Sequence, residues 1–242
     1  MTTITLNRPE VRNALDQDAC FELAGIFDAF EADEEQRVAI VTGAGEKAFC
    51  AGADLKNAVQ QVPPSGFAGL CTRFDRTKPL IAAVNGLAVG GGFETVLACD
   101  IVVAADHAEF GLLEARWGVA ALAGGVQRLA ATVGTKRAMG MLLTARKIDA
   151  QRAFEFGVVN EVVPAAELMA AARRWANEIL ACSPMSLQAQ RAMLRAAEAR
   201  KIESAVAEMS TLPEVRAMLA SEDLREGARA FAEKRNPRWK NR

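Results

Sequence analysis

Three short runs of apolar residues constrain the fold of this chain more than any other feature. Residues 38–42, 80–84 and 101–105 are rich in Val, Ile, Leu and Ala and show no alternation with polar side chains. Such runs are typical of strands that are covered on both faces, as in parallel sheets. They alternate with helical patterns, among them a helix that Asp16 can cap. The order predicts an α/β fold with largely parallel strand pairing.

The pattern changes beyond about residue 145. A helix is expected from Asp149 to Phe156, followed by a turn and a short strand at residues 157–163. Apolar residues at helical spacing then predict four helices at 165–181, 184–199, 202–220 and 221–235. We therefore expect a core at residues 1–180 and a C-terminal helical region at residues 181–242.

Composition favours a small-molecule partner. The 242 residues are 51% hydrophobic and 24% charged, with a formal net charge of −1, which provides no general attraction to nucleic acid or anionic membrane. No apolar run reaches the length of a membrane helix, and no basic-then-apolar leader is present, so we expect a cytoplasmic protein. The single histidine, His107, and five unpaired cysteine positions predict no metal site.

Two glycine-rich segments, residues 48–55 and 85–94, each follow an apolar run. Glycine allows bare backbone N–H groups to approach a ligand closely, and two such donors around a developing negative oxygen form an oxyanion hole. Alternatively, these glycines have a purely structural role and only make tight turns. A dinucleotide site is disfavoured because the second segment lacks the G-x-G-x-x-G spacing.

Glu94 and Glu114 are the candidate acid and base. Glu94 ends the second glycine segment at the start of a predicted helix, and Glu114 follows the run Phe110–Leu113. Considered alone, each of these two glutamates is more typical of a charged side chain exposed to solvent than of a catalytic residue. Two carboxyl groups in one partly dry pocket ionise unequally, however, so that one acts as an acid while the other acts as a base. Addition of water across a double bond requires that combination.

Several motifs together resemble the crotonase (enoyl-CoA hydratase/isomerase) superfamily over nearly the whole chain. They lie at residues 4–9 with 12–15, 48–56, 85–94 with Asp100, 110–111 with Glu114, 157–160 and 231–235. The resemblance implies a spiral of ββα units. It also implies a C-terminal helical region that supports a homotrimer, commonly paired into a hexamer.

The resemblance assigns roles to four catalytic positions. The backbone N–H groups of Ala53 and Gly91 would hold the thioester oxygen. Glu94 would activate water and Glu114 would protonate the α-carbon, which makes enoyl-CoA hydratase the leading reading: reversible syn addition of water to trans-2-enoyl-CoA. Coenzyme A belongs to the substrate, and no separate cofactor or metal is expected.

The resemblance also implies a coenzyme A path. Arg12 and Ala14 would lie near the nucleotide, and Phe231 and Lys234 would reach in from a neighbouring subunit. The remaining expected contacts along the adenine and pantetheine are Ala51, Asp54, Leu55 and Lys56.

Two departures from the family pattern concern the acyl end of the site. Leu112-Leu113 stands where a proline often precedes the acid, and Ala121-Leu122 replaces a usual Pro-Gly pair. Leu122 would narrow the acyl pocket, whose specificity is also expected to depend on residues 58–67. These departures leave open another acyl-CoA enzyme of the superfamily, such as a carnitinyl-CoA-type dehydratase or an isomerase. The arginine-rich C-terminal tail leaves a crotonase-fold RNA-binding protein as a third reading.

Overall fold

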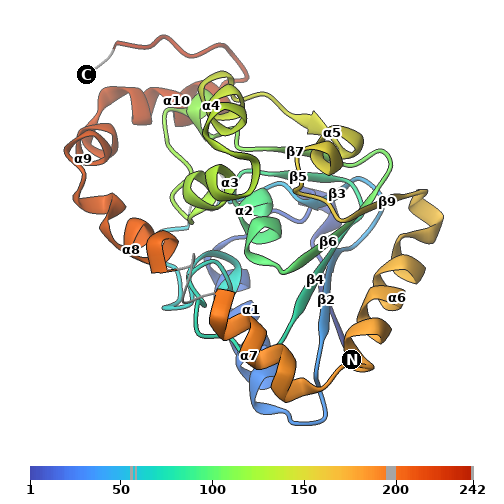
Figure 1. Ribbon diagram of the computed structural model, residues 1–242. Helices are drawn as coiled ribbons and strands as arrows, with labels where there is room; N and C mark the ends of the chain where they lie inside the picture. Colours follow the sequence, from blue (N-terminus) through green and yellow to red (C-terminus); the bar gives the residue numbers. More distant parts are fainter. Residues whose placement is uncertain (55–56, 58, 195–199, 241–242) are drawn as a thin grey trace.

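The computed structural model describes residues 1–54, 57, 59–194 and 200–240 (Figure 1). Its larger sheet has the order β1-β2-β4-β6-β9, and every neighbouring pair in it is parallel. The strands are β1 (Thr2–Leu6), β2 (Ala39–Gly43), β4 (Leu80–Val84), β6 (Ile101–Ala105) and β9 (Glu161–Val163). The three apolar runs are therefore the three central strands, as predicted.

A second sheet has the order β3-β5-β7-β8. It comprises β3 (Ala48–Cys50), β5 (Leu87–Val89), β7 (Glu109–Gly111) and β8 (Ile148–Asp149), and only its β7–β8 pair is antiparallel within the described sheets. The consecutive pairs β2–β3, β4–β5 and β6–β7 each add one strand to each sheet in the same direction. This repeated advance is the spiral of ββα units that the family resemblance implied.

Helices cover both faces of the larger sheet (Figure 1). On one face, α6 (Leu168–Leu180) places Ala171, Ala172 and Ala176 against alternate side chains of β2, β4 and β6. The opposite face packs against the main core, which includes Phe27 of α1 (Gln17–Ala32) and Phe93 of α2 (Gly91–Ala98). Asp16 caps α1 by accepting the N–H of Ala19 at 3.0 Å, as expected. Burial on both faces explains the absence of polar alternation in these strands.

Further helices complete the core between β7 and β9. Strand β7 is followed by η3 (Glu114–Trp117), a short 3-10 helix, and by α3 (Gly125–Val133) and α4 (Thr135–Thr144), before the chain returns to the second sheet at β8. The expected helix at 149–156 is α5 (Ala150–Glu155), capped by Asp149. Among the described residues, no helix is long and apolar enough to cross a membrane.

The C-terminal region follows an arc along the left of Figure 1. It contains α7 (Pro184–Leu194), α8 (Arg200–Glu208), α9 (Pro213–Ala220) and α10 (Glu222–Ala232). The prediction of one helix over 202–220 is wrong, because the chain is extended at Leu212 (φ −64°, ψ 130°) before Pro213. Proline disfavours helical geometry in the residue before it, and it starts α9 instead. The predicted end of α7 at 199 falls outside the described residues, and the division at 180/181 stays a prediction.

Candidate active site

The two glycine-rich segments meet where β3 and β5 end. Gly52 has a left-handed φ of +91°, and a Cβ placed on it would lie 3.0 Å from the carbonyl oxygen of Val89 and 3.1 Å from the amide nitrogen of Gly91. Glycine at position 52 is thus required both by its backbone conformation and by the close approach of the second segment. This approach brings the peptide that follows Gly52 beside the start of α2.

The N–H of Ala53 is aimed by a parallel bridge to Leu15. Leu15 donates to the carbonyl of Gly52 at 2.9 Å, and its own carbonyl accepts the N–H of Asp54 at 2.8 Å. In such a bridge the residue between the two bonded peptides directs its own N–H and C=O away from the partner strand. The N–H of Ala53 therefore faces away from the 13–15 segment. In the described part of the chain it donates no hydrogen bond.

Gly91 supplies the second donor at the first position of α2. The first N–H groups of a helix have no partner inside it, and the helix dipole places partial positive charge there. A Cβ on Gly91 would lie 2.5 Å from the ring of Phe67, so the buried Phe67 closes one side of this helix start. Within the described residues neither the Ala53 nor the Gly91 N–H donates a hydrogen bond, and such a pair of backbone donors is suited to a developing oxyanion.

Glu94 lies one turn further along α2 and is only 4% exposed. Its Oε1 accepts the N–H groups of Ala123 and Gly125, each at 2.8 Å. The pKa of this carboxyl is raised, because burial outweighs the two N–H donors and the nearby Arg128 guanidinium, which act in the opposite direction. The two donors hold Oε1 in one position.

Glu114 is the first residue of η3 and is half-buried. Its Oε2 is buried and has no hydrogen-bond partner among the described residues. Its Oε1 faces Gly90, since a Cβ placed on that glycine would lie 3.5 Å away. Burial, followed by the charge on Glu94, raises the pKa of Glu114 to about 8. At neutral pH Glu114 therefore carries a proton.

The structure places Glu94, Glu114 and the peptides of Ala53 and Gly91 on adjoining elements, and their catalytic roles stay a prediction. Glu94 and Glu114 interact electrostatically, and Gly90, which faces Glu114, directly precedes the donor Gly91. The half-buried Leu122 precedes Ala123, one of the two donors to Glu94. Two carboxyl groups of unequal environment and two backbone N–H groups thus lie on adjoining elements. This set can remove a proton beside a thioester and transfer a second proton at the next carbon.

The residues predicted along the coenzyme A path lie in two paired segments. The N–H of Ala51 donates to the carbonyl of Arg12 at 3.0 Å, which joins residues 12–15 to residues 51–54. The Arg12 side chain is exposed, whereas Ala14 is buried. Asp54 is buried and lies 3.5 Å from the Arg8 guanidinium. Leu55 and Lys56 fall outside the described residues, and coenzyme A binding at all these positions stays a prediction.

Phe231 lies in α10 and Lys234 lies just after its end, and α10 packs against η3 of the same chain. The Phe231 ring lies edge-on to Trp117 with ring centroids 4.9 Å apart, and Lys234 is exposed. Their reach into the site of a neighbouring subunit stays a prediction. Within the part of the chain that the structure describes, no cluster of three or more His, Cys, Asp or Glu side chains could hold a metal ion.

Comparison with known families bears on the whole chain. The family model described as Enoyl-CoA hydratase/isomerase matches residues 1–242. The chain belongs to this family. The resemblance inferred from separate motifs is therefore confirmed at family level, and the spiral fold is that of the enoyl-CoA hydratase/isomerase family.

Individual relatives are similar over nearly their full length. A carnitinyl-CoA dehydratase of Citrobacter koseri is 44% identical across 99% of this chain and 94% of its own. A crystallographic neighbour, a carnitinyl-CoA dehydratase from Mycobacterium avium 104, is 43% identical with a TM-score of 0.90, covering 99% and 95%. An enoyl-CoA hydratase/isomerase from Pseudoalteromonas atlantica T6c is 26% identical with a TM-score of 0.88, covering 98% and 95%.

Sequence reasoning did not single out Arg128, which contacts the loop around Glu94. Its Nη1 donates to the carbonyl of Ala123 at 3.2 Å. In sequence, an arginine in the first turns of an amphipathic helix resembles a solvated charge. The signal that could have found it is its position four residues after Gly124, where its side chain points back toward the start of α3.

Proposed function

We propose that this member of the enoyl-CoA hydratase/isomerase family is a hydro-lyase that dehydrates carnitinyl-CoA. The observation that carries the proposal is the unequal Glu94–Glu114 pair beside two free backbone donors. The sequence alone favoured hydration of a simple trans-2-enoyl-CoA. The carnitinyl-CoA dehydratases at 43–44% identity support the alternative better.

In the proposed reaction, the thioester oxygen accepts hydrogen bonds from the N–H groups of Ala53 and Gly91. Ionised Glu114 removes the proton from the α-carbon, and the electron pair moves into the thioester as an enolate held by the two donors. As the double bond forms, the C–O bond at the β-carbon breaks and protonated Glu94 gives its proton to the departing hydroxyl. Water leaves, and the enoyl thioester is the product.

The proton count is the same in both directions. Dehydration begins with the proton on Glu94, and hydration begins with it on Glu114, so the active enzyme carries one proton on the pair. The raised pKa of Glu114, about 8, favours the hydration-ready arrangement in the free protein. We expect a bell-shaped dependence of rate on pH, with activity falling above about pH 8 as the shared proton is lost.

The acyl group of carnitinyl-CoA is compatible with leucine at position 122, where this chain departs from the family pattern. It is a four-carbon chain that ends in a trimethylammonium group, so it is short and has a bulky end. Leucine is half-buried at position 122, beside the Ala123 donor to Glu94, and would shorten the pocket beyond the β-carbon. A shortened pocket disfavours long acyl chains, which distinguishes this proposal from a general fatty enoyl-CoA hydratase.

The proposal is tested by following the absorbance of the conjugated enoyl thioester. Purified protein is mixed with carnitinyl-CoA, 3-hydroxybutyryl-CoA or 3-hydroxyoctanoyl-CoA. We expect kcat/KM to be highest for carnitinyl-CoA. Glu94→Gln and Glu114→Gln should each lower kcat by about 10²–10⁴-fold, the usual range for a general acid or base. Glu178→Gln, on the exposed surface of α6, is the matched control and should retain full activity.

Other outcomes would change the assignment. A higher kcat/KM for 3-hydroxybutyryl-CoA would favour the simple enoyl-CoA hydratase reading. Exchange of the α-proton with solvent without loss of water, retained in Glu114→Gln, would indicate an isomerase-like enzyme that depends on Glu94.

A further inference from the structure

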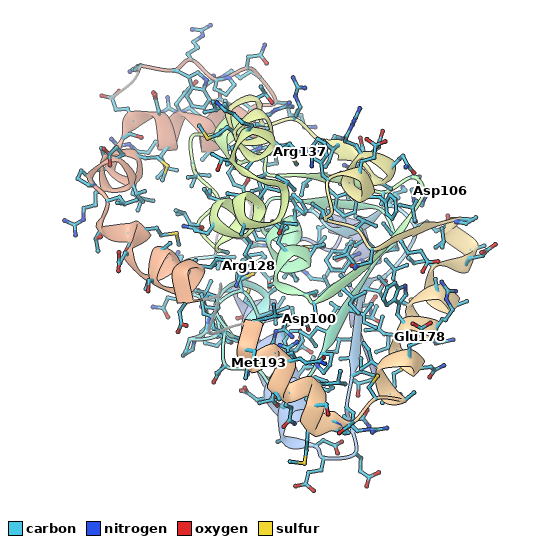
Figure 2. The ribbon with its side chains drawn as sticks, in the orientation of Figure 1. Asp100, Asp106, Arg128, Arg137, Glu178 and Met193 are labelled. Carbon is cyan, nitrogen blue, oxygen red and sulfur yellow. The ribbon has the colours of Figure 1, made fainter. Side chains whose placement is uncertain are left out.

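Arg128 is a half-buried charged residue that lines a cavity. It projects from α3 near the centre of the view in Figure 2. Its Nη2 donates to the carbonyl of Cys71 at 2.6 Å, its Nη1 donates to the carbonyl of Ala123, and its guanidinium lies 5.1 Å from the centre of the Phe74 ring. The guanidinium therefore bridges two loops that are more than 50 residues apart in sequence.

The loop that Arg128 holds is the one that fixes Glu94. Ala123 presents its carbonyl to Arg128 and its N–H to Glu94. Gly124 turns the chain with φ +89°, and a Cβ on it would lie 2.4 Å from Arg128 Nη1. Gly125 then donates the second N–H to Glu94. Arg128 thus wraps the turn whose two outer peptides bind the carboxylate.

Among the residues that the structure describes, no carboxylate lies within ion-pair distance of Arg128. Arg73, Arg76 and Arg191, which share a cavity of about 600 Å³ with it, each form an ion pair with an aspartate. Arg128 forms none among the described residues, and burial lowers its pKa. Partial removal of a charge from water without an ion partner costs free energy, which makes a functional reason for retaining Arg128 worth testing.

We propose that Arg128 is the positioning residue for Glu94: by binding the carbonyl of Ala123 it sets the two N–H groups that orient the Glu94 carboxyl group. This inference rests on the proposed role of Glu94. In the proposed reaction Arg128 contacts no reacting atom. It acts on Glu94 through the 123–125 turn and through its positive charge.

The electrostatic part has a definite sign. The charged or titratable groups that act on Glu94 are Arg128, Glu114 and the buried thiol of Cys71. Among these only Arg128 is a cation, and it lowers the pKa of Glu94. Removing the guanidinium therefore raises that pKa, so the acidic limb of the kcat–pH profile moves to higher pH.

The test compares Arg128→Met, Arg128→Lys and Arg73→Met. Arg73 is a matched control because it also bridges two carbonyls, those of Gly69 and Ala24, and lies over a phenylalanine ring, but pairs with Asp28 away from Glu94. For Arg128→Met we expect kcat to fall about 10²-fold, with KM changed little and the acidic limb shifted upward. Arg128→Lys keeps the charge, so the acidic limb of the kcat–pH profile should return to its wild-type position. Only part of kcat should be recovered. Arg73→Met should leave the limb in place.

A second readout keeps the test independent of the substrate. Protein labelled with ¹³C at glutamate side-chain carboxyls, with Glu94→Gln used for assignment, reports the ionisation of Glu94 directly by NMR titration. We expect a higher Glu94 pKa in Arg128→Met than in the wild type. If the pKa and the acidic limb are unchanged, or if kcat falls only in step with stability as in Arg73→Met, the positioning role is overturned. If no tested thioester reacts but the Glu94 pKa rises, the proposed function fails while this inference stands.

Discussion

Glu94 and Glu114 serve one site but are held in different ways. Glu94 is 4% exposed and accepts two N–H groups on one oxygen from the start of α3. Glu114 is half-buried on a four-residue 3-10 helix, and its buried Oε2 has no partner among the described residues. One carboxyl is oriented by backbone donors, whereas the other has no such support. Unequal support of this kind makes the two carboxyls differ in proton affinity, so that a single proton can be shared between an acid and a base.

The two residues also depend on different parts of the chain. Glu94 on α2 and the 123–125 turn at the start of α3, which binds its carboxyl group, belong to the spiral core. The η3 turn that carries Glu114 packs against α10, where a Cβ on Gly227 would lie 2.0 Å from the carbonyl oxygen of Trp117. One turn earlier in α10, the carbonyl of Asp223 lies 2.6 Å from where a Cβ on Gly118 would be. The C-terminal helix thus supports the acid, and the core supports the base.

Gly125→Ala should break the Glu94 side of this comparison. The added Cβ would lie 2.8 Å from both Cγ and Oε1 of Glu94, so the carboxylate must move from its donors. We expect kcat to fall about 10²-fold, and the free energy of unfolding to fall by about 1–3 kcal/mol, as for other overpacked interiors. Steady-state kinetics and urea unfolding measure the two effects.

The control for this substitution is Gly140→Ala in α4, where the added Cβ meets no atom within 4 Å. It should keep full activity and gain up to about 1 kcal/mol of stability from helix propensity. Full activity of Gly125→Ala would show that the two N–H donors of the 123–125 turn do not set the position of Glu94.

Gly227→Ala should disturb the Glu114 side. The added Cβ would displace α10 from Trp117 and loosen η3, without touching the donors to Glu94. We expect a smaller fall in kcat, about tenfold, because Glu114 already lacks a fixed hydrogen bond. Gly25→Ala in α1, with open space around its Cβ, is the matched control in the same assay. A loss as large as that of Gly125→Ala would mean that both carboxyls need equal positioning.

A further prediction concerns the dependence of stability on pH. The pKa of Glu114 is raised from 4.5 to about 8, so the folded protein binds this proton more tightly than the unfolded chain. The resulting stability is fully present below pH 4.5 and is lost as pH rises to about 8, at up to about 1.4 kcal/mol per pH unit. Glu114→Gln lacks this term and should be more stable than the wild type at pH 9.

Urea unfolding at pH 5, 7 and 9 measures that difference. Glu178→Gln, at an exposed position, should follow the wild type throughout. Parallel pH profiles for Glu114→Gln and the wild type would contradict the raised pKa and, with it, the separation of acid from base.

Sequence patterns predicted the parts of the fold that depend on local chemistry. Strands at 80–84 and 101–105 match β4 and β6 residue for residue, because continuous apolar runs need cover on both faces. Asp16 caps α1 because its carboxylate can accept a free N–H. The two glycine segments predicted close backbone approach, which the contact of Gly52 with Gly91 confirms.

Other features depend on contacts between distant residues and were not predictable from local pattern. The spiral came only from the family resemblance, since alternation of strands and helices fits several parallel folds. The helix expected at 202–220 failed because apolar periodicity continued through Pro213, although the proline should have outweighed it. The two hydrogen bonds that Glu94 accepts were not predicted, because both donors are main-chain N–H groups that lie 29 and 31 residues away in the sequence.

The bridge between Leu15 and Ala53 has a consequence for how this protein can be studied by mutational scanning. The donor at position 53 is a peptide N–H whose direction is set by hydrogen bonds to Leu15, so changing the side chain leaves the donor in place. A complete set of alanine substitutions would therefore leave this proposed contribution undetected. Only a change to the main chain itself, such as proline or a backbone ester at position 53, removes the hydrogen.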